Sequence, residues 1–323
     1  MKVRFQTVYN EWPTMLVLAL DTTTREGSLA LGRDGEVFDC WTGDASLTHA
    51  RRLPGDILDG LSRHGLTLAD VSLFAVAAGP GSFTGLRIGI ATIQGLAFAH
   101  GRPVVGVSAL DALAYAALGW EQAAGEIAPG PFSPPPADAT RSQAPSTKPP
   151  NSPTGAPLRI GAWMDAQRQE VFACLYEWSG PTPAEAAAAR GEEEEASPGS
   201  VEGEGTAAGL GELRLAAGPE VGFPAEILAR ADWKPAPGTI WVGDGALAYR
   251  NVIEGAAGEG KARIVEPIPR LAPAICAIAA RRAGLGLATA PHAVRPVYIR
   301  RPDAELARDR RRQAPDGRQG HIA

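Results

Sequence analysis

Apolar and polar positions divide the chain into short uninterrupted apolar runs and longer stretches with helical spacing. The runs at 16–20, 28–31 and 37–40 are separated by turn residues and predict a three-stranded antiparallel start. The runs at 73–78 and 104–107 have no polar alternation, which is typical of parallel strands buried on both faces. This order of strands predicts an α/β fold with mixed sheets.

Two longer stretches carry apolar residues at the spacing of an amphipathic helix. They span 48–64 and 84–100, and Gly101 ends the second as a helix C′ residue. The apolar residues are Leu53, Ile57, Leu61, Leu86, Ile90, Ile93 and Ala97. Periodicity alone allows these side chains to serve either the chain's own core or a partner interface. A shorter helix at 109–118 and a later one at 272–287 are also predicted, the later one packing back on the first lobe.

Two stretches, about 121–157 and 179–211, lack periodicity and are rich in small residues and proline or in acidic residues. We interpret them as low-complexity insertions. They divide the chain into a first lobe at 15–120 and a second lobe at 158–301, with an extension or misassigned start at 1–14 and an Arg-rich tail at 302–323. The second lobe opens with a predicted hairpin, as the first does, so the order of elements suggests a duplicated architecture.

Composition narrows the class of protein. The 323 residues carry a net charge of −5, which gives no general signal for nucleic-acid binding. Cys40, Cys174 and Cys276 lie far apart and fit neither a disulfide framework nor a zinc site. The scattered cysteines fit a reducing cytosol, so we expect a cytoplasmic protein. No apolar run reaches the roughly 18–20 residues that span a bilayer, so we expect no membrane partner.

The segment 79–85, Gly-Pro-Gly-Ser-Phe-Thr-Gly, joins a predicted strand to a helix N-terminus, where free N–H groups and the helix dipole attract anions. Phosphate contact through Gly79, Gly81, Ser82 and Thr84 is one interpretation. The other is a tight structural turn. The spacing matches neither the Walker pattern nor a strict GxGxxG, so the signal is weak alone.

Asp21 ends the first apolar run and is followed by Thr22 and two further threonines. A carboxylate and hydroxyls at this place can hold a metal-bound phosphate, or they can close an Asx or ST turn. No His pair has metal-ligand spacing, and no serine has a base nearby in sequence, so neither a metal site nor a catalytic triad is predicted. His49 and His64 are expected at the surface or as capping residues.

Several segments resemble the TsaB (YeaZ) family of tRNA threonylcarbamoyladenosine biosynthesis proteins. They are LALDTTTREGSLAL, AAGPGSFTGLRIGIATIQGLAF and VVGVSALDALA, with WMDAQRQEVFACLY and PVYIR as later landmarks. The resemblance covers about 16–117 and parts of 158–300. It implies a two-lobed actin/Hsp70/sugar-kinase-like fold, interrupted here by the two insertions.

The resemblance also implies a function. Members act as non-catalytic partners of a paralogous subunit, TsaD, which modifies adenosine 37 of tRNA, and an ATPase, TsaE, joins them. It implies a heterodimer with TsaD, tRNA contact only through the complex, no required cofactor, and a homodimer when the partner is absent. The metal-binding HxxxH of the paralogue aligns with Ala109 and Leu113, which cannot ligate a metal.

In this family the two helices of the first lobe pack against the partner's equivalent helices, which assigns the seven apolar residues above to the partner interface. Whether the loop at 79–85 binds nucleotide stays open. A stand-alone nucleotide-dependent transferase using Asp21 and this loop is the alternative function. A peptidase is a third hypothesis, for which the sequence offers neither a metal motif nor a triad.

Overall fold

The computed structural model describes residues 14–123, 157–179, 212–258 and 262–300. Apart from a few flanking residues, the predicted N-terminal extension, both low-complexity insertions and the Arg-rich tail lie outside these ranges. Within them, no helix has the length and apolar character needed to cross a bilayer.

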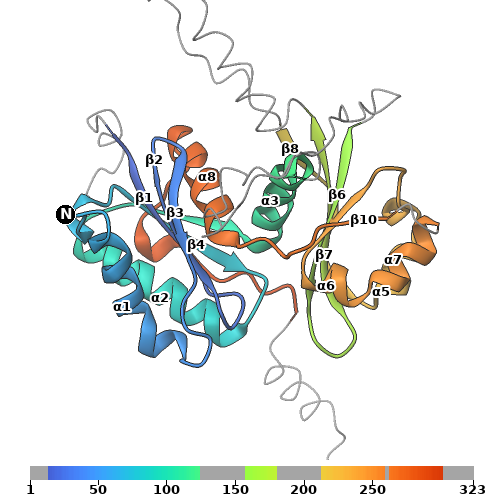
Figure 1. Ribbon diagram of the computed structural model, residues 1–323, viewed down its shortest axis with the longest axis horizontal. Coiled ribbons are helices and arrows are strands. Elements are labelled where there is room, and N and C mark those ends of the chain that lie inside the picture. Colours follow the sequence, from blue (N-terminus) through green and yellow to red (C-terminus); the bar gives the residue numbers. More distant parts are fainter. Residues whose placement is uncertain (1–13, 124–156, 180–211, 259–261, 301–323) are drawn as a thin grey trace, which may run out of the picture.

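Two five-stranded sheets form the frame of the molecule (Figure 1). The first has the order β3-β2-β1-β4-β5 and consists of β1 (Leu16–Asp21), β2 (Ser28–Arg33), β3 (Glu36–Trp41), β4 (Leu73–Gly79) and β5 (Val104–Ser108). The second has the order β8-β7-β6-β9-β10 and consists of β6 (Leu158–Asp165), β7 (Val171–Ser179), β8 (Glu212–Gly222), β9 (Ile240–Val242) and β10 (Arg263–Ile264).

The two sheets share one topology. In each, the first three strands pair antiparallel, and the last two add parallel to the other side of the first strand. This confirms the predicted two-lobed α/β architecture of the actin/Hsp70/sugar-kinase type. The repeated strand order also agrees with a duplication, which the amino-acid sequence indicates only through its order of elements.

Helices and sheets alternate in five layers (Figure 1). The outer helices of the first lobe are α1 (His49–Ser62) and α2 (Phe83–Ala99). The middle layer holds α3 (Ala109–Ala123) and α8 (Leu271–Gly284), of which α8 covers the first sheet and α3 contacts both sheets. The second sheet is covered on its far side by α5 (Pro224–Ala229), α6 (Asp244–Ala248) and α7 (Arg250–Ala257).

The apolar faces of α1 and α2 point toward the first sheet. All seven residues assigned above to a partner interface are at most 4% exposed, and all except Leu86 belong to one cluster with the leucines of β1 and β2. Leu86 lies under the glycine loop. These side chains are therefore core residues, and their assignment to a partner interface is corrected. They bury the leucine-lined face of the first sheet, so they are not available to contact a partner.

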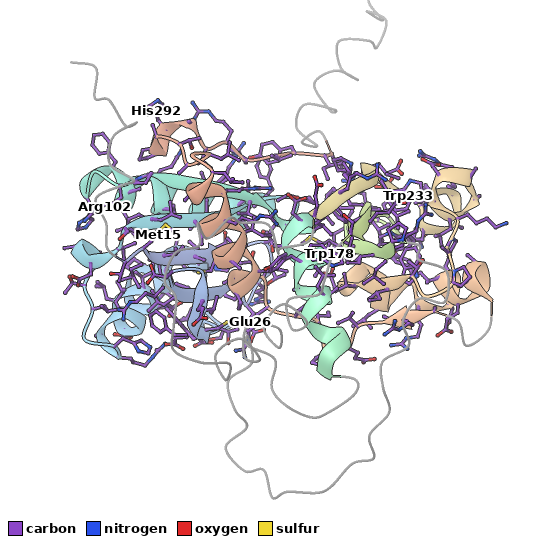
Figure 2. The ribbon with its side chains drawn as sticks, turned by 90° about the horizontal axis from the view of Figure 1, so that it is seen from above. Met15, Glu26, Arg102, Trp178, Trp233 and His292 are labelled. Atoms are coloured by element: carbon purple, nitrogen blue, oxygen red, sulfur yellow. The ribbon has the colours of Figure 1, made fainter. Side chains whose placement is uncertain are left out.

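Aromatic side chains fill the second lobe. Trp163, Trp233 and Trp241 are fully buried there, whereas Trp178 packs in the middle layer (Figure 2). The sequence pattern does not predict β8. This edge strand has little apolar alternation and contains Gly218-Pro219, so it depends on pairing with β7 rather than on its own propensity.

Candidate functional site

A cleft of about 760 Å³ lies between the two lobes. On the first lobe its walls are the turn after β1 and the glycine loop after β4, so it sits at the carboxyl ends of parallel strands, where α/β sheets commonly bind ligands. The β6–β7 turn forms the facing wall, and residues 297–300 form another. A smaller cavity of about 240 Å³ shares Thr24, Met164 and Asp244 with the cleft and therefore adjoins it.

The glycine loop is packed tightly against other parts of the chain. Gly79 has φ +116°, and a Cβ there would lie 2.5 Å from the carbonyl oxygen of Val297. Gly81 has φ +151°, and a Cβ there would lie 2.5 Å from Cβ of Thr23. Only glycine combines this backbone conformation with such close approach. These two predicted phosphate contacts are thus explained by packing within the chain.

The N-terminus of α2 is bonded within the chain as well. The Ser82 N–H donates to the Thr23 carbonyl at 2.9 Å, and the Ser82 hydroxyl accepts from the Gly85 N–H at 3.2 Å. The Ser82 carbonyl accepts from the Leu86 N–H at 2.8 Å. Ser82 therefore serves as the N-cap of α2 and links the helix to the β1–β2 turn. Thr84 is exposed in the first turn of the helix.

Thr22 faces α2 and not the cleft. It is fully buried. A Cβ on Gly85 would lie 2.1 Å from the Thr22 carbonyl oxygen, and a Cβ on Gly89 would lie 2.2 Å from the Thr22 hydroxyl. The two glycines let the helix approach this turn closely. The predicted contact between Thr22 and phosphate is corrected accordingly, because the helix occupies the space around the hydroxyl.

Asp21 closes the turn after β1. Its carboxylate accepts hydrogen bonds from the Thr23 N–H at 2.8 Å and the Thr23 hydroxyl at 2.7 Å, which is the geometry of an Asx turn. Burial raises the pKa of Asp21, and the two hydrogen bonds from Thr23 oppose that rise. The side chain is 3% exposed and borders the smaller cavity.

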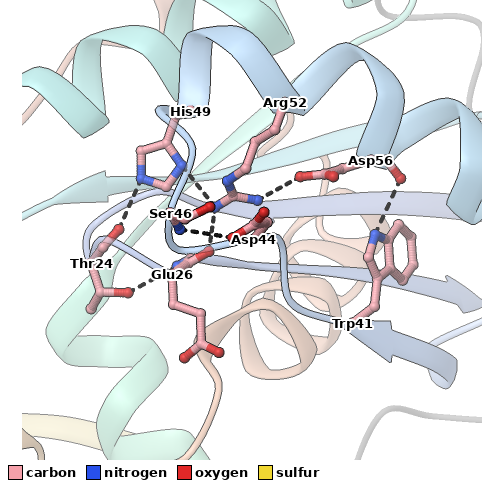
Figure 3. A network of polar contacts seen from close by, with 9 residues as sticks. Thr24, Glu26, Trp41, Asp44, Ser46, His49, Arg52 and Asp56 are labelled. Carbon is pink, nitrogen blue, oxygen red and sulfur yellow. Dashed lines mark hydrogen bonds and ion pairs between the residues drawn. The ribbon is translucent and has the colours of Figure 1, made fainter.

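A partly buried polar network holds the same turn from the side of α1 (Figure 3). His49 Nε2 lies 2.9 Å from the Thr24 carbonyl, and its Nδ1 lies 2.9 Å from Arg52. Arg52 also bonds the Glu26 carbonyl and pairs with Asp56. These partners suit a neutral imidazole that donates from Nε2 and accepts at Nδ1. His49 is 8% exposed and follows Thr48, which is the N-cap of α1, so the prediction that it is a surface or capping residue is wrong.

The buried contacts of His49 cannot be predicted from the sequence, because a single histidine next to a helix start does not indicate which residues of the fold it will contact. His64, in contrast, is exposed and pairs with Asp39 at 2.8 Å, as a surface residue would. Residues 297–300 were also missed as site residues. Their one signal was the resemblance of PVYIR to a family landmark.

Metal ligation has no support in the described ranges. Ala109 and Leu113, the two positions that the family resemblance matches to metal ligands, are buried at 0% and 2% exposure. In the same ranges no three His, Cys, Asp or Glu side chains gather as a metal site would require. The cleft itself combines apolar walls with Arg25, Asp165, Gln167, Asp244 and Arg300, a mixed lining that is typical of ligand sites.

Comparisons with known proteins agree with the fold. A family profile described as "TsaD: tRNA N6-adenosine threonylcarbamoyltransferase" matches residues 43–143. The tRNA threonylcarbamoyladenosine biosynthesis protein TsaB of Escherichia coli is 41% identical over 106 residues, 32% of this chain and 44% of that protein. TsaB of Haemophilus influenzae is 41% identical over 114 residues, 35% of this chain and 48% of that protein. The chain thus matches less than half the length of these relatives.

Solved structures extend the similarity to both lobes. YeaZ from Pseudomonas aeruginosa covers 88% of this chain and 99% of its own, with a TM-score of 0.57 and 25% identity. A second structure from that organism, titled as an uncharacterized protein with similarity to peptidase YeaZ, covers 88% and 100% with a TM-score of 0.57 and 26% identity.

Proposed function

Because this chain belongs to the TsaB/YeaZ family, we propose that it is the non-catalytic activating subunit of the bacterial complex that forms N6-threonylcarbamoyladenosine at position 37 of tRNA. Its proposed partners are the catalytic subunit TsaD, with which it forms a heterodimer, and the ATPase TsaE. It meets tRNA in the cytoplasm only as part of that complex and needs no cofactor of its own. Without TsaD, it pairs with a second copy.

The observation that carries this proposal is the outer surface of α1 and α2. Leu58 on α1 is 53% exposed and Phe98 on α2 is 82% exposed, although both are large apolar residues. Gly55 and Gly95 are exposed beside them, with open space where a side chain would be. Exposed apolar side chains between small residues suit close packing against another helix pair. The partner surface therefore lies on the outward faces of these helices, opposite the seven core residues.

The glycine loop supports a non-catalytic role. The turn at Thr22 and Thr23 is packed against by three glycines, Gly81, Gly85 and Gly89. The Ser82 hydroxyl already accepts a hydrogen bond as the N-cap of α2. A phosphate would have to displace these contacts before it reached the helix N-terminus. The loop thus acts as a joint that fixes α2 on the first sheet.

A second candidate is a stand-alone nucleotide-dependent transferase of the same fold. The observation in its favour is the interlobe cleft, whose volume suits a nucleotide-sized ligand, with the carboxyl group of Asp21 in the adjoining cavity. Nucleotide turnover by the purified chain separates the two candidates. Turnover that Asp21→Asn abolishes would favour the transferase.

The proposal is tested by co-purification with TsaD of the same organism and a tRNA threonylcarbamoylation assay. Leu58→Asp and Phe98→Asp each place a charge on the proposed surface and should weaken binding at least tenfold, with parallel loss of modification. Leu215→Asp is the matched control, since Leu215 is 43% exposed on β8, in the second lobe. Binding that survives both variants, or that the control weakens equally, would refute this partner surface.

A further inference from the structure

Residues 291–300 run along the first lobe before they reach the second. The Gln94 side chain on α2 donates to the carbonyls of Pro291 and Val294 at 2.8 and 3.0 Å. The Val297 N–H then donates to the Ala78 carbonyl at the end of β4, at 2.7 Å. This segment is thereby fixed to both the helix and the strand that flank the glycine loop.

Tyr298 fastens the segment to the first turn of α2. Its ring lies 5.1 Å from the ring of Phe83, and its hydroxyl accepts from Arg87 Nε at 3.0 Å. The Arg87 guanidinium lies 3.9 Å from the centre of the Phe83 ring and so completes a compact cation–π cluster.

Arg300 crosses to the second lobe. Its guanidinium donates to the Ala166 carbonyl at 2.5 Å and forms an ion pair with Glu170, both in the β6–β7 turn. It also lies over the ring of Phe172, 5.7 Å from its centre. The Arg300 and Glu170 side chains are only 21% and 25% exposed. A charge-assisted contact shielded in this way is stronger than an open surface pair.

The lobes are also joined through the middle layer. Asp111 on α3 accepts from the Tyr176 hydroxyl of β7 at 2.8 Å and from Arg282 of α8 at 3.0 Å. Leu113, from the same helix, borders the smaller cavity, whereas residues 297–300 border the larger cleft. The two connections between the lobes therefore lie at different parts of the space between them.

We infer that residues 297–300 are a strap that holds the two lobes closed, and that Arg300 is its lock. Two lobes that share a packed layer can open about that layer unless something bridges the cleft elsewhere. In proteins that close around a ligand, the ligand supplies the bridge. Here an arginine of the chain itself supplies it, and the last described residues end between the lobes (Figure 1).

The strap also explains the glycine at position 79. A side chain there would strike the Val297 carbonyl, so the loop leaves room for the strap and not for a ligand. Tyr298 and Gln94 hold the same segment against α2. Opening of the cleft is therefore coupled to the position of α2 on the first sheet.

The test uses the full-length chain with Arg300→Gln, and with Arg295→Gln as the matched control, since Arg295 is an exposed arginine of the same segment. Spin labels at Ser62→Cys on α1 and Ala256→Cys on α7, with Cys40→Ser to remove the half-buried thiol, report the distance between the lobes. We expect Arg300→Gln to broaden and lengthen this distance. It should also raise amide exchange in the turn at 165–170 about tenfold, whereas the control matches the wild type.

Exchanging the two charges of the ion pair distinguishes loss of this contact from unfolding of the protein. Arg300→Glu alone should open the lobes more than Arg300→Gln, and Arg300→Glu with Glu170→Arg should recover part of the closed distance, because the pair is restored in reverse. Thermal melts identify any Arg300 variant that is unfolded. In that case Glu170→Gln, which removes the same ion pair from the other side, is measured in its place. Interlobe distances and exchange rates in Arg300→Gln and Glu170→Gln equal to those of the control would overturn the strap.

Discussion

Gly85 lies so close to Thr22 that a Cβ on the glycine would sit 2.1 Å from the threonine carbonyl oxygen. Gly89, one turn later, is equally close to the hydroxyl of the same residue. The N-terminal half of α2 is thus seated on the β1–β2 turn with no space between them. Gly95, on the outward side of the same helix, has open space in place of such a contact.

These glycines allow a matched test of that seating. Gly85→Ala should destabilise the protein by about 1–3 kcal/mol, because the helix must move away from the turn. Gly95→Ala should leave stability unchanged or raise it by up to about 1 kcal/mol, since alanine favours helix and meets nothing here. Thermal melts followed by circular dichroism measure both. Equal melting temperatures for the two variants would contradict the close packing.

Arg52 anchors the β1–β2 turn to α1 with a side chain that is 3% exposed. Arg52→Met should lower the free energy of unfolding by about 2–4 kcal/mol, since it leaves the Glu26 carbonyl and His49 without their donor. Arg51→Met changes the exposed neighbouring arginine and should cost less than about 0.5 kcal/mol. Urea unfolding measures both, and a small effect at Arg52 would show that the network adds little.

Asp21 predicts a pH dependence of stability. Because burial raises its pKa above the ordinary 3.8, the folded state binds this proton more tightly than the unfolded state. Stability therefore falls as the pH rises from about 3.8 through the folded pKa, and the loss persists above it. Asp21→Asn keeps an acceptor for the Thr23 N–H and should melt at a higher temperature than the wild type at pH 7. The gap should close toward pH 4.

Asp70 predicts a dependence of stability on pH that is opposite in sign to that of Asp21. Hydrogen bonds from Thr67 lower its pKa, so its contribution to stability is present at neutral pH and is lost as the pH falls below 3.8 through the folded pKa. Asp70→Asn should therefore melt below the wild type at pH 7, and the two should converge in acid. Melting curves of both variants that shift in the same direction at pH 7 would contradict the assignment.

The three thiols should differ in reactivity. Burial raises the pKa of all three thiols, to about 12 at Cys174 and Cys276, whereas Cys40 is only half-buried and so remains partly accessible to a reagent. At pH 8 the two buried thiols hold almost no thiolate, so a disulfide reagent should modify them only as fast as the protein unfolds. Cys40→Ser should remove the early phase of modification. A fast phase that survives this substitution would show that a core thiol is open to solvent.

Much of the frame can be predicted from the amino-acid sequence, because a strand buried on both faces leaves an uninterrupted apolar run, whereas an amphipathic helix leaves an apolar stripe with a period of about 3.6 residues. The apolar runs of β1, β4 and β5 and the stripes of α1 and α2 were recognised in this way. Periodicity does not say which surface covers a stripe. The family resemblance assigns the stripes at Ile57 and Ile90 to a partner interface, yet the chain's own sheet covers both of them.

The site was harder to predict, because its residues act through distant neighbours. Gly79 is recognisable as a turn glycine, but the segment that it admits lies more than 200 residues later along the chain, at Val297. The sequence predicts a surface or capping residue at His49, because the Thr24 carbonyl that contacts it comes from another loop. Contacts of this kind depend on the tertiary fold and leave no local pattern.

The middle layer has a consequence for synthesis of the chain on the ribosome. One face of the first sheet is covered by α8, whose residues follow β5 by more than 160 positions. At roughly 5–20 residues per second, that face stays without its cover for about 8–30 s after the sheet has emerged. The first lobe therefore cannot bury this apolar face until α8 has been synthesised.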